Sequence, residues 1–237
     1  QNGFIPGSIN IQGNNAFATW MGWFISYDEQ FILVAEPHQM DDLTRKLMRI
    51  GLDNIFGFVD AGKIRAIGLS NEKAWGAMRC AEEIRKDNLV PISTTQNAYS
   101  MLNRVFEGDL AEVSLREDIG LLAYSPLASG VLSGKYIEGT AADNARLKLF
   151  PRFARYSSEQ SIEATKQYLQ LAKELGISLT TLSLAFVNQR PFVTSNIIGA
   201  TNLEQLKENI ESIDTELSQE TLDRIEAIHA VIPNPAP

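Results

Sequence analysis

At 237 residues, 44% of them apolar, the chain is long enough to bury a sizeable core as one large domain or two small ones. Its formal net charge of −8, with no local cluster of Lys and Arg, argues against a nucleic-acid-binding surface. The single cysteine, Cys80, excludes an internal disulfide and fits a reducing compartment such as the cytoplasm, and with only 2 histidines a Cys/His zinc centre is not expected.

The first 61 residues show no regular alternation of strand and helix. Residues 1–20 are rich in Gly, Asn and Ser and are predicted to form a loop, and residues 24–35 contain strand-like apolar runs. Residues 41–50 are predicted to form a short amphipathic helix that Gly51 ends. The apolar runs are too short for a membrane span and no signal-peptide pattern is present, so no membrane association is expected. Because the chain begins with Gln1 rather than Met, we expect a fragment or a processed product.

From residue 62 onward, strand-like and helix-like segments alternate. The predicted strands are residues 64–69, 92–96, 121–124 and 197–198, parallel and adjacent in that order. The predicted helices are residues 72–86, 107–116, 158–175, 180–190, 203–210 and 217–232, with a long loop over 137–157. Such alternation predicts an α/β fold with a parallel sheet and ligand groups on the loops after the strands. Four units of this kind equal half of a (β/α)8 barrel.

Two segments have the pattern of an anion site. In residues 121–136 and 196–210, an apolar strand leads through a turn of small residues into a segment that can become a helix. In the second segment, Asn202 is predicted to cap the helix. Free N–H groups and the helix dipole both favour phosphate at such a point. Two such sites in one chain suggest a cofactor that carries phosphate.

Four motifs also resemble a known family. They are IRAIGLSNE at residues 64–72, TTQNAYSMLN at 94–103, the loop over 124–136 and the segment 199–209. In order and spacing they resemble the second half of an aldo-keto reductase, with most likeness to the Tas-like bacterial branch, which is also similar to the beta subunits of voltage-gated potassium channels. The resemblance covers about residues 62–237. It implies a (β/α)8 barrel of which this chain carries the C-terminal, NADP-binding half, after a divergent segment over residues 1–61.

The resemblance implies roles for residues at the nicotinamide end of the cofactor. Tyr124 would stack on the nicotinamide ring. The carboxamide would be met by Ser70, Asn71 and Gln96. The pyrophosphate would be lined by Ser125, Leu127, Ser129 and Gly130. From the residues alone, each role has an alternative. Tyr124 could be a core aromatic at a strand end, the three polar side chains could be bonded to nearby backbone, and the pyrophosphate segment could be an ordinary loop.

The resemblance also implies residues for the phosphates and the adenosine end. Lys135 and Arg146 would supply positive charge, although lone cations in a loop can equally be solvated. The 2′-phosphate and adenine would be held by Thr201, Gln205, Glu208 and Asn209. The last three recur at helical spacing, a pattern that also fits a solvated helix face. The implied cofactor is therefore NADP.

No catalytic residue is assigned. The family reduces aldehydes or ketones by hydride transfer with an Asp, a Tyr, a Lys and a His, in that order, in the first half of its barrel. Residues 1–61 contain the right types in Tyr27, Asp28, His38 and Lys46, but in the wrong order. We interpret Tyr27 and Asp28 as a turn, His38 as part of a loop, and Lys46 as part of a solvated helix face.

Three hypotheses follow for the whole chain. The first is an NADP(H)-dependent oxidoreductase that acts on a small carbonyl substrate. The second is a non-catalytic half-barrel, or dinucleotide-binding module, that keeps the cofactor surface but lacks the proton donor. The third concerns residues 1–61, whose lack of family motifs would be explained by a disrupted reading frame or by an incomplete chain joined across gaps. Since an open half-barrel exposes two sheet edges, self-association is also expected.

Overall fold

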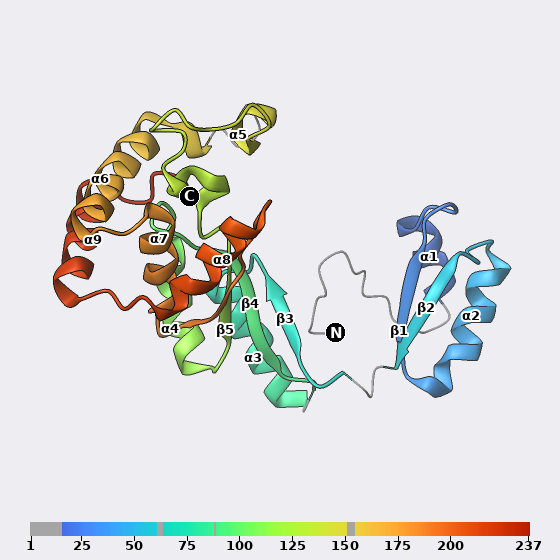
Figure 1. Ribbon diagram of the computed structural model, residues 1–237. Helices are drawn as coiled ribbons and strands as arrows, with labels where there is room; N and C mark the ends of the chain where they lie inside the picture. The colour runs from blue at the N-terminus through green and yellow to red at the C-terminus, as the bar shows by residue number, and fades with distance from the viewer. Residues whose placement is uncertain (1–15, 61–63, 88, 151–154) are drawn as a thin grey trace. The chain divides into compact units, whose positions relative to one another are not determined.

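A computed structural model describes residues 16–60, 64–87, 89–150 and 155–237 of the chain (Figure 1). Contacts divide the chain into two compact units, one of residues 1–69 and 79–93 and the other of residues 70–78 and 94–237. The predicted loop over residues 1–15 lies outside the described residues. Among the described residues, no helix has both the length and the apolar character needed to cross a membrane.

The N-terminal part of the first unit is a small parallel α/β layer. Its elements are α1 (Phe17–Phe24), β1 (Phe31–Ala35), the 3-10 helix η1 (Pro37–Gln39), α2 (Met40–Arg49) and β2 (Ile55–Asp60). β1 and β2 pair in parallel, with Val34 opposite Val59. Leu43 and Leu47 lie one helical turn apart on α2 and are buried in the core of this layer, as the predicted amphipathic helix requires.

One prediction for this region was wrong, and another is confirmed only in part. Residues 17–20, predicted to be loop, begin helix α1, because Phe17 and Met21 are spaced four apart and both are buried in the core. The strand predicted within residues 24–35 is limited to β1, since α1 continues to Phe24. The sequence analysis also missed β2, whose apolar residues are interrupted by Gly57.

Within the described residues, four further strands form one sheet in the order β3-β4-β5-β6. Figure 1 labels β3, β4 and β5 of this sheet. The strands are β3 (Ile67–Ser70), β4 (Ile92–Ala98), β5 (Gly120–Tyr124) and β6 (Val193–Asn196). β4 pairs in parallel with β5, and β5 in parallel with β6. The predicted strand order is therefore confirmed, and the fold is α/β with parallel sheets.

The last strand lies earlier than predicted. β6 ends at Asn196, before the pair at 197–198, although the Ile197 N–H still donates to the Ala123 carbonyl at 2.8 Å. Two of the β6 residues, Thr194 and Ser195, are polar and exposed. A search for apolar runs therefore selected the two isoleucines that follow the strand.

The helices of this region largely agree with the predicted ones. They are α3 (Ala74–Asp87), α4 (Asp109–Arg116), α5 (Arg146–Leu149), α6 (Glu159–Leu175), α7 (Leu179–Asn188), α8 (Leu203–Glu211) and α9 (Gln219–Val231). Short 3-10 helices are η3 (Val105–Glu107), η4 (Ala128–Ser133) and η6 (Ser212–Asp214). The predicted Asn202 cap of α8 is confirmed. Helix α6 agrees with its predicted range of 158–175, because the Ser158 side chain caps its first turn and Gly176, at φ 69°, ends it. α5 is an unexpected helical turn within the predicted 137–157 loop.

Helix α7 forms the centre of the second unit. All residues from Leu179 to Val187 except Thr181 are buried, and α7 contacts α6, α8 and β6. The C-terminal segment is fastened to the same unit, because the Ala236 N–H donates to the Leu102 carbonyl at 3.0 Å. This packing fixes the loops that follow β4 and β5, where the predicted cofactor residues lie.

Candidate cofactor site

Polar groups from three neighbouring strands meet where β3, β4 and β5 end. The Asn71 N–H donates to the Gln96 carbonyl at 2.9 Å, and the Tyr124 hydroxyl donates to Asn71 Oδ1 at 2.8 Å. Asn71 Nδ2 lies 3.3 Å from Ser70 Oγ. The structure thus brings together the four residues predicted for the nicotinamide end. Asn71 adopts the left-handed conformation at φ 53°, which Asn tolerates better than most residues.

Tyr124 is fixed both through its backbone and through its side-chain hydroxyl. In the β4–β5 register it lies opposite Ala98, and its carbonyl accepts the Tyr99 N–H at 3.2 Å. Its hydroxyl is bonded to Asn71. The ring is half-buried, so it is fixed in direction while part of its surface remains accessible. A fixed, partly accessible aromatic ring is a suitable stacking surface for a flat heterocycle.

The loop after β5 has an unusual backbone. Three successive residues, Ala128, Ser129 and Gly130, have positive φ angles of 47°, 57° and 89°, and Ser125 has a φ of 54°. For a residue with a Cβ this conformation costs about 1–2 kcal/mol. Such strain persists only where the surrounding structure enforces it, and it gathers at ligand-binding sites. It therefore supports a binding role for this loop.

Lys135 places a positive charge over the same loop. A Cβ added to Gly130 would lie 2.9 Å from Lys135 Nζ, so the ammonium group lies directly above that glycine. The Leu147 N–H donates to the Tyr136 hydroxyl at 3.2 Å, which ties α5, and with it the exposed Arg146, to the segment that carries Lys135. Two cations thus accompany the predicted pyrophosphate loop, which includes the half-buried Leu127.

The turn before α8 forms a second polar cluster. Gln205 Oε1 accepts the Thr201 N–H and the Thr201 hydroxyl, both at 2.9 Å. Asn209 Nδ2 donates to the Gly199 carbonyl at 3.2 Å. Three of the predicted adenosine-end residues are therefore gathered around one helix start. The fourth, Glu208, accepts a 2.5 Å hydrogen bond from Ser178, the cap of α7, so its carboxylate also has a structural partner.

A buried ionic cluster, which was not predicted from the sequence, is linked through Tyr99 to the strand end that carries Tyr124. Arg104 donates to Glu107 through Nε at 2.9 Å and to Glu226 through Nη2 at 2.8 Å, and Tyr99 donates its hydroxyl to Glu107. Burial raises the pKa of Tyr99. Burial also favours a raised pKa for Glu107, but the hydrogen bonds from Arg104 and Tyr99 outweigh it and lower that pKa. Because the Tyr99 N–H holds the Tyr124 carbonyl, this cluster supports the candidate site.

The four residues of catalytic type in the N-terminal segment belong to the first unit. Tyr27 and Asp28 form a turn, as predicted, and Tyr27 is 66% exposed. His38 lies in η1 rather than in an irregular loop. Lys46 forms an ion pair with Asp42 on α2 at 2.8 Å. Within the described ranges, no group of three or more His, Cys, Asp or Glu residues is arranged to hold a metal ion.

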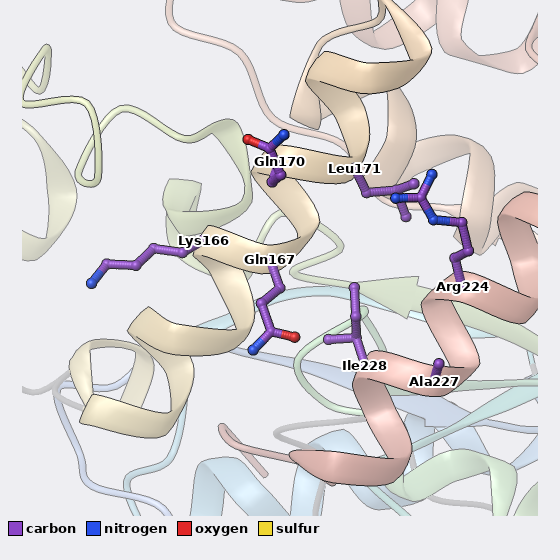
Figure 2. Close-up of a pocket in the computed structure, with 7 residues that line it drawn as sticks. All are labelled: Lys166, Gln167, Gln170, Leu171, Arg224, Ala227 and Ile228. Carbon is purple, nitrogen blue, oxygen red and sulfur yellow. The ribbon is translucent and has the colours of Figure 1, made fainter.

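Two grooves in the second unit are lined by other residues. One, of about 450 Å³, lies between α6 and α9 and is lined by the apolar side chains of Leu171 and Ile228 together with the polar side chains of Lys166, Gln167 and Arg224 (Figure 2). The other, of about 570 Å³, lies beside α4 and is lined in part by Arg190 and Phe192. Neither contains a predicted cofactor residue. We favour the strand exits as the binding site because, among the residues that the structure describes, fixed polar groups, a strained loop and positive charge converge only there.

Comparison with known proteins identifies the family. A sequence model of the Aldo/keto reductase family matches residues 35–230. The chain is 50% identical over 186 residues to Protein tas of Escherichia coli (strain K12), which is 78% of this chain and 54% of that protein. It is 36% identical over 166 residues to an aldo-keto reductase of Babesia bovis, 67% of this chain and 58% of the relative. It is 32% identical over 165 residues to a probable voltage-gated potassium channel subunit beta of Oryza sativa subsp. japonica, 65% and 50%.

The chain therefore belongs to the aldo/keto reductase family, which confirms the resemblance seen in its motifs. The matched range begins at residue 35, ahead of residue 62, where the quoted motifs begin. The chain spans about half the length of the curated relatives that it matches.

Proposed function

We propose that this chain binds NADPH along the strand exits of β3 to β6, as the C-terminal half of a (β/α)8 barrel. The observation that carries the proposal is the convergence of Ser70, Asn71, Gln96 and Tyr124 from three strands, next to a strained loop. Ligand sites of α/β folds lie at the carboxyl ends of their strands, which is where these residues lie.

The residues that are present fit such a cofactor in chemical type. Tyr124 offers the stacking face for the nicotinamide, and Ser70 and Asn71 offer polar groups for its carboxamide. The loop after β5 offers a backbone held in a strained conformation, and Lys135 above Gly130 offers a cation for the pyrophosphate. Thr201 and Gln205 lie at the α8 start, where the helix dipole favours a further phosphate. Bound NADPH would supply the hydride of an NADP(H)-dependent reduction of an aldehyde or ketone.

Arg146 lies on α5, after the predicted pyrophosphate loop, and is proposed to reach the 2′-phosphate and so to distinguish the two nicotinamide cofactors. Replacing Arg146 with Glu should weaken NADPH binding about tenfold or more and NADH binding much less, because only NADPH carries the 2′-phosphate and a charge-assisted hydrogen bond contributes about 1.5–3 kcal/mol. The measurement is a fluorescence titration of each cofactor. Lys148→Glu on the same helix is the matched control, since Lys148 pairs with Asp143 and is expected to change both affinities little. Equal losses for both cofactors would show that Arg146 does not contact the 2′-phosphate, and no NADPH binding by the unaltered chain would overturn the proposal.

A second candidate function is a dinucleotide-binding module without catalysis. Two observations favour it: Tyr27 is largely exposed on a turn, and Lys46 is committed to an ion pair with Asp42. Tyr27 and Lys46 are therefore not arranged as a tyrosine proton donor with a lysine beside it.

We accordingly expect the 237-residue chain not to reduce carbonyls at a meaningful rate. A general acid contributes about 10²–10⁴-fold to such a reaction, and each donor to the developing oxyanion about 10²–10³-fold. The measurement is NADPH absorbance in the presence of a reactive aldehyde. Sustained oxidation that the Tyr27→Phe variant abolishes would contradict this expectation and favour the oxidoreductase.

A further inference from the structure

The turn after β3, residues 70–72, is held by the neighbouring strand β4 at two points. The Asn71 N–H donates to the Gln96 carbonyl at 2.9 Å, and Asn97 Nδ2 donates to the Glu72 carbonyl at 3.0 Å. The first bond uses only backbone atoms, whereas the second depends on the identity of one side chain. Asn97 is not among the predicted cofactor residues, yet it fixes the turn that carries two of them.

The orientation of the Asn97 side chain follows from its partners. A backbone carbonyl can only accept a hydrogen bond, so Asn97 directs its amide nitrogen toward Glu72. Its oxygen then faces Thr95, whose hydroxyl donates to Asn97 Oδ1 at 2.6 Å. Thr95 lies two residues earlier on the same face of the strand and is fully buried. Because a buried hydroxyl is costly to leave without a partner, this bond keeps the Asn97 amide in place.

The two bonds from β4 lie on either side of a strained residue. Asn71 has a φ of 53°; its own N–H is held before that residue, and the Glu72 carbonyl is held after it. A strained conformation persists only where the surrounding structure over-determines it, and these two bonds do so. Asn71 Oδ1 accepts the Tyr124 hydroxyl, and Asn71 Nδ2 lies 3.3 Å from Ser70 Oγ. The position of Asn71 therefore sets how these polar groups meet.

Glu72 connects the same turn to helix α3. Its carboxylate oxygen Oε1 accepts the Lys73 N–H at 2.9 Å, and a Cβ added at Gly76 would collide with that oxygen. The Glu72 side chain thus lies over the start of the helix, while its carbonyl is bonded to Asn97. These residues all belong to the second unit.

We infer that Asn97, fixed by Thr95, is a positioning residue for the nicotinamide end of the cofactor. The inference rests on the proposed binding of NADPH at the strand exits. Asn97 acts through the backbone of residues 70–72, which it holds in the conformation that presents Ser70 and Asn71 to the carboxamide. Groups that are already ordered before binding give higher affinity, because less conformational freedom is lost when the ligand arrives.

The Asn97→Asp variant tests this role. It removes the N–H donor but keeps an oxygen that accepts from Thr95. NADPH binding should weaken about tenfold, because one hydrogen bond is lost and a carboxylate oxygen is set against the Glu72 carbonyl. Fluorescence titration measures this affinity. Calorimetric titration with 2′-phospho-ADP-ribose, which has the phosphates and adenine of NADPH but lacks the nicotinamide, should change by less than about twofold. A general loss of structure would weaken both ligands.

Thr95 offers a second test that adds no charge. Thr95→Val keeps the shape of the side chain but removes the hydroxyl that holds Asn97, and should weaken NADPH binding about fivefold. Thr95→Ser keeps the hydroxyl and should bind NADPH within about twofold of the unaltered chain. Unaltered circular dichroism would show that the variants fold.

Gln189→Glu is the matched control. Gln189 Nε2 donates to the Leu217 carbonyl at 3.4 Å, so this variant also exchanges an amide for an acid and removes a bond to a backbone carbonyl. Gln189 precedes β6 rather than following a strand of the sheet. The control should therefore bind NADPH as the unaltered chain does.

Hydrogen exchange gives a measurement that needs no cofactor. The Asn71 N–H should exchange about tenfold faster in Asn97→Asp than in the unaltered chain, because β4 then holds the turn at one point instead of two. Unchanged exchange, unchanged NADPH affinity, or equal losses of NADPH and 2′-phospho-ADP-ribose would each overturn the inference while leaving the proposed function in place. An unaltered chain that binds no NADPH would instead overturn the proposed function, and the role of Asn97 with it.

Discussion

Replacing Arg104 with Ala is expected to lower the free energy of unfolding of the second unit by about 3 kcal/mol, at the lower end of the range for breaking a buried ion pair. The Arg104 side chain is only 4% exposed, and it holds both Glu107 and Glu226. Its guanidinium also lies 5.2 Å from the centre of the buried Phe186 ring. Truncation would leave two carboxylates without their shared partner and a cavity beside an aromatic ring.

The lower end of that range is appropriate because the carboxylates are less buried than the arginine. Glu107 is 23% and Glu226 46% exposed, so water can hydrate part of the charge that Arg104 leaves behind. Arg190 also remains 3.6 Å from Glu226. Hydration and Arg190 therefore reduce the loss of stability. They do not replace the bidentate contact in which Arg104 Nε and Nη2 donate to the two carboxylate oxygens of Glu107.

An exposed ion pair on α4 supplies the control. Arg116 contacts Glu112 at 2.7 Å, but the two side chains are 74% and 65% exposed. Arg116→Ala should therefore cost less than about 1 kcal/mol. Urea unfolding followed by circular dichroism measures both variants. Equal losses for the two would mean that the buried cluster does not contribute as an ion-pair network.

Local signals in the sequence were sufficient for most helices of the second unit. The Ser158 cap and the Gly176 stop define α6, because a hydroxyl that accepts an N–H and a left-handed glycine act within one turn of chain. β6 shows where local signals fail. Its polar residues Thr194 and Ser195 give no apolar run, and the strand forms because β5 offers a free edge.

The candidate site could be predicted only in part. The motifs at residues 64–72, 94–103 and 124–136 were sufficient to predict Ser70, Asn71, Gln96 and Tyr124, because each motif is a short continuous segment at or near a strand end. The cluster behind them could not be found in the same way. Arg104 and Glu107 are three residues apart, a pair that the sequence can suggest. Glu226, however, lies 122 residues from Arg104, and only the folded chain brings it there.

Replacing Tyr124 with Ala is expected to weaken NADPH binding by about 2 kcal/mol, or about thirtyfold, since stacking adds about 0.5–1.5 kcal/mol to the burial of the ring surface. The proposed geometry makes the ring, not the hydroxyl, the main contact. Tyr124→Phe keeps the ring and removes only the hydrogen bond to Asn71 Oδ1. That variant should lose about 1 kcal/mol, or about fivefold.

The decisive quantity is the difference in NADPH affinity between the Tyr124→Ala and Tyr124→Phe variants, which fluorescence titration measures. A hydrogen bond that merely orders Asn71 would be lost equally in both variants, so equal affinities would mean that the ring does not stack on the cofactor. A larger loss for Ala than for Phe assigns the excess to the ring face. Because the Tyr99 N–H holds the Tyr124 carbonyl through the backbone, neither substitution removes the contact that fixes this position. The comparison therefore measures what the side chain contributes to binding at a strand end that stays in place.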